Sequence, residues 1–185
     1  KWAFKWCALD RPDNRKVHKK IMPRLGGLAV FIAFTAAVLL TQELTSNVIG
    51  LLVGGGLIVV LGFFDDTRGL SPKVKLAGQV VAACVVTAFG VRVDFLTNPF
   101  GEEYLLLCLL SIPVTVLWIV SVTNAVNLID GLDGLAGGTV GIAGLTLAAV
   151  VYIETMQSGG LPGQYEAITL ALILVAAVLG FLRYN

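Results

Sequence analysis

Six long stretches of this sequence contain no Asp, Glu, Lys or Arg, and they leave few folds open to the chain. Each is 16 to 19 residues long, close to the roughly 17 to 25 residues that a helix needs to cross a bilayer core. The 57% apolar share and the mean hydropathy of +0.88 exceed those of an ordinary soluble domain. The sequence therefore predicts an all-α, polytopic membrane helical bundle with six complete transmembrane helices, which form a single integral membrane domain over residues 1–185. The six stretches are residues 25–40, 48–64, 76–91, 104–122, 135–153 and 167–182.

The basic residues are distributed unequally between the two ends of these stretches. If the connecting segments alternate across the membrane, one side carries 12 of the 13 Lys and Arg residues, and only Arg92 lies on the other side. Cytoplasmic loops carry such an excess of Lys and Arg. The basic side is therefore predicted to face the cytoplasm. It consists of residues 1–24, 65–75, 123–134 and 183–185.

Polar residues recur at every third position in one cytoplasmic segment, between two apolar stretches. They are Asn124, Asn127, Asp130 and Asp133. If this segment is helical, the spacing places the four side chains on one slowly rotating face. Acids at a membrane boundary are costly unless a cation or a phosphate-bearing ligand uses them. The pattern favours a functional site over a capped loop.

Two further clusters lie at the two ends of the short segment between the second and third stretches. Asp65 and Asp66 are adjacent carboxylates that repel each other, and Mg²⁺ with substrate phosphates would relieve this repulsion. The alternative is neutralisation by Arg68, Lys73 or Lys75. Ser71 and Pro72 are typical of a helix start. Lys73 and Lys75 would then lie in the first helical turn, where the helix dipole disfavours cations unless an anion binds there.

The basic head of the chain is the fourth cluster. Arg15, Lys16, His18 and Arg24 offer donors for phosphate oxygens. The alternative is a polybasic patch that fixes topology and touches anionic lipid headgroups. The order Asp-x-Pro, Arg-Lys-x-His and Pro-Arg-x-Gly-Gly is more structured than that alternative requires.

Together, the four clusters resemble the motifs of the polyprenyl-phosphate N-acetylhexosamine-1-phosphate transferases, glycosyltransferase family 4. The resemblance covers essentially the whole chain, and the first loop is similar to that of the N-acetylglucosamine-1-phosphate branch. The motifs are Asp10-x-Pro12-x-x-Arg15-Lys16-x-His18 with Pro23-Arg-x-Gly-Gly27, Gly62-Phe-Phe-Asp-Asp66, Ser71-Pro-Lys-Val-Lys-Leu-Ala-Gly-Gln79, and Asn124-Ala-Val-Asn-Leu-Ile-Asp-Gly-Leu-Asp-Gly-Leu-Ala136.

The resemblance implies a reaction in the bacterial plasma (inner) membrane, with the active site facing the cytoplasm. A membrane-embedded undecaprenyl phosphate would attack the β-phosphorus of a UDP-N-acetylhexosamine, and UMP would leave. Mg²⁺, with Mn²⁺ as a substitute, would be the cofactor. No nucleic-acid partner is implied, and a homodimer is compatible with the sequence. The reaction would be the first membrane step of a cell-wall or surface polysaccharide.

The resemblance also implies roles for individual residues. Asp65, Asp66, Asp130 and Asp133 would be catalytic, with the first two near the lipid phosphate and the last two on the nucleotide side. Asn127 and Asp66 would be on the metal side. The expected substrate-binding residues are Lys75, Asn124, Arg24, His18, Arg15 and Lys16.

Two features of the family have no counterpart in these 185 residues, namely a Phe-x-Gly-Asp motif with a metal-binding Asp and a later His-rich cytoplasmic loop. We therefore expect a fragment of a ten- or eleven-helix protein, inactive by itself; measurable turnover by the 185-residue chain would contradict this. Two other functions stay open. One is the phospho-N-acetylmuramoyl-pentapeptide transferase of peptidoglycan synthesis, and the other, from a different class, is a secondary transporter. A scaffolding role would leave the Asn and Asp pattern unexplained.

Overall fold

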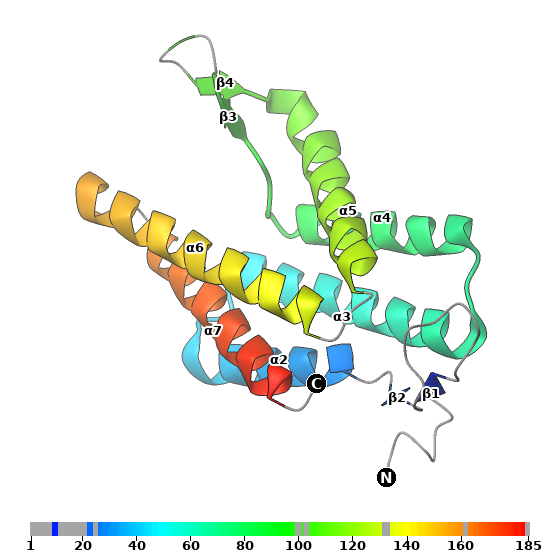
Figure 1. Cartoon of the computed structure of the whole chain (residues 1–185). Helices are drawn as coiled ribbons and strands as arrows, with labels where there is room; N and C mark the ends of the chain where they lie inside the picture. The colour runs from blue at the N-terminus through cyan, green and yellow to red at the C-terminus, as the bar shows by residue number, and fades with distance from the viewer. Residues whose placement is uncertain are drawn as a thin grey trace. The chain divides into compact units, whose positions relative to one another are not determined.

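A computed structural model shows long helices, two of which are separated by a hairpin of short strands (Figure 1). In the basic head, only the backbone of residues 9–10 and 22–23 is described, and these residues form two short strands. The structure describes residues 9–10, 22–23, 26–98, 101, 104–130, 134–160 and 163–183.

Six α-helices account for most of the described residues, which confirms the predicted all-α membrane architecture. Two pairs of short antiparallel strands, β1 Leu9–Asp10 with β2 Met22–Pro23 and β3 Phe95–Thr97 with β4 Tyr104–Leu106, and one 3₁₀ turn, η1 Cys108–Leu110, complete the described elements. The helices are α2 Gly26–Thr41, α3 Ser46–Arg68, α4 Pro72–Ala88, α5 Ser111–Ile129, α6 Leu135–Ser158 and α7 Gln164–Leu182.

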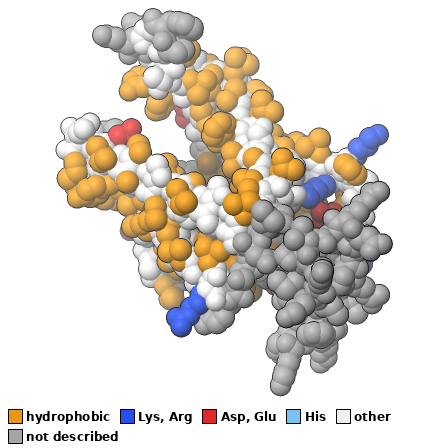
Figure 2. Space-filling view, in the orientation of Figure 1, with side chains coloured by type: hydrophobic (Ala, Val, Ile, Leu, Met, Phe, Trp, Pro, Cys, Tyr) orange, Lys and Arg blue, Asp and Glu red, His pale blue; other side chains and the backbone are white. Residues whose placement is uncertain are grey.

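Four described segments are long and apolar enough to cross a membrane. They are α3, the continuous segment Cys108–Ile129 that contains α5, α6 and α7. The apolar helix α2 is shorter, with 16 residues, and α4 has 17. Apolar side chains cover most of the helical surface in the view of Figure 2, and charged side chains are few there. Such a surface suits contact with lipid rather than with water.

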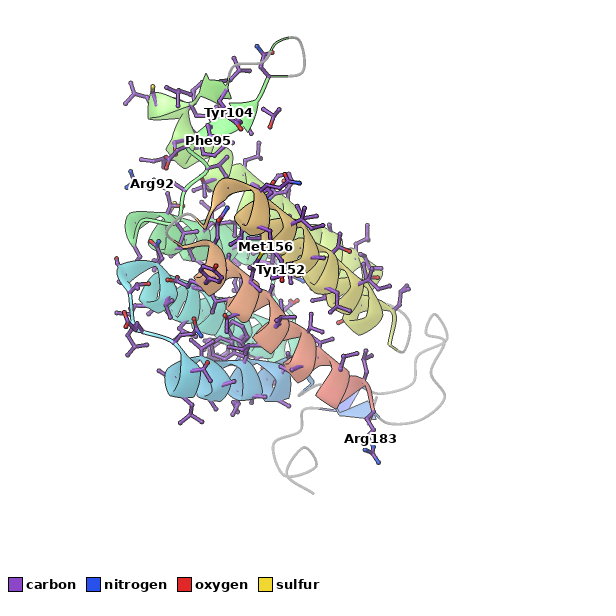
Figure 3. The ribbon with its side chains drawn as sticks, turned by 90° about the vertical axis from the view of Figure 1, so that its left-hand side faces the viewer. Arg92, Phe95, Tyr104, Tyr152, Met156 and Arg183 are labelled. Atoms are coloured by element: carbon purple, nitrogen blue, oxygen red, sulfur yellow. The ribbon has the colours of Figure 1, made fainter. Side chains whose placement is uncertain are left out.

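The prediction for the fourth apolar stretch, residues 104–122, was wrong at its beginning. Residues Tyr104–Leu106 form strand β4, and the rings of Tyr104 and Phe95 pack edge to face with centroids 5.1 Å apart (Figure 3). Hydropathy alone does not distinguish an apolar strand from a helix. Helix α5 starts only at Ser111, so Pro113 lies in its first turn, where the missing N–H breaks no helical hydrogen bond.

The chain divides into two compact units. The first comprises residues 1–43 and 126–185, in which α7 packs against both α6 and α2. Glycines on α6 allow this close approach: a Cβ atom on Gly144 would lie 2.7 Å from the Cγ2 atom of Val175 on α7. Gly144 thus has the packing role that small residues commonly have in membrane helix pairs.

The second unit comprises residues 44–125, and its centre is the packing of α3 against α4. Val48 on α3 and Ala82, Ala83 and Val86 on α4 are buried there. The two helices touch where α3 has glycine, because a Cβ atom on Gly54 would overlap the side chain of Val86.

We expect Gly54→Ala to lower the melting temperature of the detergent-solubilised protein, with a cost of about 1 to 3 kcal/mol from overpacking. Gly62→Ala in the same helix is the matched control, because nothing lies within 4 Å of a Cβ atom there. That change should leave the melting temperature unchanged or raise it, since alanine favours a helix over glycine. Equal melting temperatures for the two variants would contradict this packing.

Polar contacts close the second unit at the end opposite to Asp65. Arg92, the single basic residue predicted outside the cytoplasm, donates from Nε to the carbonyl oxygen of Thr87, 3.2 Å away at the end of α4. A cation is favoured at this end of a helix. Ser111 Oγ donates to the Asp94 carboxylate at 2.9 Å, which connects the beginning of α5 to the strand region.

Candidate active site

The end of α3 and the beginning of α4 hold the first part of the candidate site. Gly69 adopts the left-handed conformation with φ 66°, and its N–H donates to the carbonyl oxygen of Asp65, which ends α3. The Ser71 hydroxyl accepts from the N–H of Val74 at 3.4 Å, and Pro72 occupies the first turn of α4. The predicted helix start at Ser71 and Pro72 is confirmed.

Asp65 and Lys75 form an ion pair across this turn. The Nζ atom of Lys75 lies 3.0 Å from Oδ2 of Asp65, and each side chain is only about a quarter exposed. The other carboxylate oxygen of Asp65 accepts the N–H of Leu70 at 3.1 Å. The anion that offsets the unfavourable position of Lys75 in the helix dipole is therefore a residue of the chain itself.

This ion pair bears on the two alternatives that the sequence left open for Asp65. The carboxylate is neutralised by a base, as the structural alternative required, and the base is one of the lysines that the functional interpretation assigned to phosphate. Both interpretations are consistent with the contact, because a Lys–Asp pair beside a cluster of polar residues can hold the ammonium group ready for a phosphate.

A second pair of side chains connects α4 to α5. Asn124 Nδ2 donates to Gln79 Oε1 at 2.7 Å, and Gln79 Nε2 donates back to Asn124 Oδ1 at 3.3 Å. Gln79 is only 3% exposed, and it lies one helical turn after Lys75 on the same face of α4. Within the second unit, the contacts of α4 thus bring Asp65 from α3 and Asn124 from α5 to one face of the same helix.

Gln79 was not predicted as a site residue. It belongs to the segment that resembles the family motif, but no role of its own was predicted for it. The available signal was a long amide one helical turn after Lys75, at the beginning of the apolar part of the helix. A polar side chain in such a position needs a buried partner.

The remaining described acids and amides of the site are exposed. Asp66 lies on α3, and Asn127 lies on α5 one turn after Asn124. The helix continues to Ile129, so the first half of the segment predicted as a cytoplasmic loop is helical, which gives Asn124 and Asn127 the shared face that the three-residue spacing predicts. Asp130 follows in a turn, with its N–H donating to the carbonyl oxygen of Val126 at 3.1 Å.

Several predicted site residues lie outside the described residues. For the basic head, the backbone pairing of Leu9 with Pro23 and of Asp10 with Met22 is described, but the segment between these strands is not. The predicted residues outside the described part are Arg15, Lys16, His18, Arg24 and Asp133.

The metal ligands stay a prediction. Within the described part of the chain, no group of three or more His, Cys, Asp or Glu side chains is placed to hold a metal ion. The donor types nevertheless fit: Asp66 supplies carboxylate oxygens and Asn127 an amide oxygen, and Mg²⁺ prefers oxygen ligands while keeping several waters.

The long apolar helices are those of a multi-pass membrane protein, and the polar residues near the ends of α3, α4 and α5 form its candidate site. Residues 48–185 match the family model described as glycosyl transferase family 4. The chain belongs to this family, as the motifs predicted.

Curated relatives agree with this assignment. The chain is 46% identical over 184 residues to the probable undecaprenyl-phosphate N-acetylglucosaminyl 1-phosphate transferase of Bacillus subtilis, covering 99% of this chain and 49% of the relative. It is 36% identical over 194 residues to the decaprenyl-phosphate N-acetylglucosaminephosphotransferase of Mycolicibacterium smegmatis, covering 99% and 48%. It is 32% identical over 198 residues to the phospho-N-acetylmuramoyl-pentapeptide-transferase of Chlorobium limicola, covering 94% and 53%.

The chain spans about half the length of the curated relatives it matches. No solved structure matches it.

Proposed function

We propose that the whole protein transfers an N-acetylhexosamine 1-phosphate, most readily that of N-acetylglucosamine, from a UDP-sugar to undecaprenyl phosphate. An oxygen of the lipid phosphate attacks the β-phosphorus of the UDP-sugar. The bond between the β-phosphorus and the bridging oxygen breaks, and UMP leaves with that oxygen. The product is a lipid-linked diphospho-sugar in the membrane.

The observation that carries this proposal is the pair of contacts on one face of α4. They join residues of three motifs, because Lys75 pairs with Asp65 and Gln79 pairs with Asn124. Phosphoryl transfer needs little covalent help from a protein, but it needs neutralisation and alignment of two anionic partners. Lys75 supplies positive charge at the acidic end of α3, and Asp65 fixes the direction of its ammonium group.

Within this proposal the two adjacent acids have different roles. Asp65 is held by Lys75 and by the Leu70 N–H, and we assign it to positioning Lys75. Asp66 is the more exposed of the two, and we assign it to the metal side together with Asn127. When bound, Mg²⁺ would neutralise charge on the diphosphate as a Lewis acid. Asp130 and Asp133 are proposed to bind on the nucleotide side.

The proposed location is the bacterial inner membrane, with the site on the cytoplasmic side. The unequal distribution of Lys and Arg supports this orientation, since 12 of the 13 lie on the side that carries Asp65, Lys75 and Asn124. A UDP-sugar is a cytosolic metabolite and could reach the site only from there. The head residues Arg15, Lys16, His18 and Arg24 are proposed to contact substrate phosphates.

The test is UMP release by the purified whole protein. We expect release with UDP-N-acetylglucosamine, undecaprenyl phosphate and Mg²⁺ together, and none after omission of the lipid or addition of EDTA. Release only with UDP-N-acetylmuramoyl-pentapeptide would instead favour the second candidate, which the relative of Chlorobium limicola supports. Uptake of a solute into proteoliposomes without UMP release would favour a transporter and contradict the proposal.

A further inference from the structure

We propose that Gln79 is a positioning residue for the reaction, and that Asn124 acts through Gln79 rather than by contacting the substrate. The amide pair between them holds α5 against α4 at Asn124. The proposal rests on the proposed function for its kinetic consequence. It departs from the sequence prediction, which placed Asn124 among the substrate-binding residues.

The hydrogen bonds of Asn124 leave its amide group no donor for a substrate. One N–H of Nδ2 donates to Gln79 Oε1 at 2.7 Å, and the same nitrogen donates to the carbonyl oxygen of Val120 at 2.8 Å. A primary amide carries only two N–H groups. The carbonyl oxygen of Asn124 accepts from Gln79 Nε2 at 3.3 Å. The oxygens of a deprotonated phosphate accept hydrogen bonds and need donors, and both donors of this amide are already used.

One member of the pair is buried. Gln79 is 3% exposed, and the other buried positions of α4 are apolar except for Thr87, whereas Asn124 is exposed. A buried amide without a partner costs about 1 to 3 kcal/mol. The chain therefore has one strongly favoured arrangement here, in which the side chain of Asn124 faces α4.

The position of Asn124 on α5 transmits this constraint to the site. Asn127 follows three residues later, about 4.5 Å further along the axis at the usual rise of 1.5 Å per residue, and Asp130 follows directly after the end of the helix. A rotation of α5 would move both side chains together. In this proposal the amide pair acts on Asn127, a proposed metal ligand, only through the helix α5 that both asparagines share.

The test exchanges the two amides. Gln79→Asn shortens one side chain by a methylene, Asn124→Gln lengthens the other, and the double variant restores the combined length. In the whole protein, we expect each single variant to lower kcat for UMP release by about tenfold, and the double variant to recover to within about threefold of the wild type. Gln157→Asn, the same change at an exposed position of α6, is the matched control and should leave kcat unchanged.

A second measurement separates positioning from folding. We expect the midpoint for Mn²⁺ binding, followed by electron paramagnetic resonance without substrates, to rise by several-fold in each single variant and to return in the double variant. Single variants that lose melting temperature but keep the wild-type Mn²⁺ midpoint and kcat would show a merely structural role and overturn the proposal. A double variant no better than the singles would also overturn it, because Asn124 would then be needed for itself.

Failure of the proposed function would look different. In that case the wild type would release no UMP under any condition. The Mn²⁺ midpoints of the four proteins would still decide whether the amide pair positions the end of α5.

Discussion

Asp66→Asn is expected to lower kcat for UMP release by at least about 10²-fold, as loss of a group that stabilises transition-state charge commonly does. The substitution keeps the shape of the side chain and removes its negative charge. Asp66 is the more exposed of the two adjacent acids, and we assign the metal-side role to it. The Mg²⁺ concentration for half-maximal rate should therefore rise as well.

The matched control for this variant is Glu154→Gln, which removes one carboxylate charge at an exposed position of α6. It should change kcat by less than about twofold. A fall of less than threefold for Asp66→Asn, with an unchanged Mg²⁺ requirement, would remove Asp66 from the site. A comparable fall for Glu154→Gln would point to a general effect of net charge instead.

Asp130→Asn is expected to cost at least about 10²-fold in kcat/KM for the UDP-sugar. Asp130 lies in the exposed turn that follows α5, and its backbone N–H is bonded to Val126, so the substitution should leave the turn intact. Because we assign this acid to the nucleotide side, the Mg²⁺ requirement should shift less than in Asp66→Asn. The measurement is UMP release as a function of UDP-sugar concentration at saturating lipid and Mg²⁺.

Glu43→Gln, in the exposed connection between α2 and α3, is the control for Asp130→Asn. It lies outside every proposed contact with substrate. A change of less than threefold for Asp130→Asn would mean that the turn after α5 is structural.

Local signals in the sequence predicted much of the fold. Charge-free apolar stretches located the helices, and Ser71 with Pro72 marked the beginning of α4 because capping chemistry depends on neighbouring residues alone. The three-residue spacing of Asn124 and Asn127 predicted a shared helical face, and both residues lie on α5.

Features that depend on long-range contact were not predictable in the same way. The apolar residues 104–110 have the hydropathy of a membrane helix, yet Tyr104–Leu106 pair with Phe95–Thr97 as strands. Periodicity is weak in so short a segment, and the pairing partner decides the outcome. The contact with Phe95 is a tertiary contact, and hydropathy does not predict it.

The candidate site shows the same division. Asp65 and Lys75 were predicted as separate features, and their ion pair was only one of two alternatives. The pair forms because the turn at Gly69 brings the two residues together, and this turn was not predicted. Gln79 was missed for a related reason. Its partner Asn124 lies 45 residues away, and no local pattern connects the two amides.

The most direct test of the central claim follows the β-phosphate of the donor. The whole protein would be given UDP-N-acetylglucosamine labelled with ³²P at the β-position, together with undecaprenyl phosphate and Mg²⁺. Phosphosugar transfer predicts that the label enters the organic phase with the lipid, while unlabelled UMP accumulates in the water phase. If the label instead stays in water as UDP, only the sugar is transferred, and a site built to align two phosphates for attack at phosphorus is contradicted.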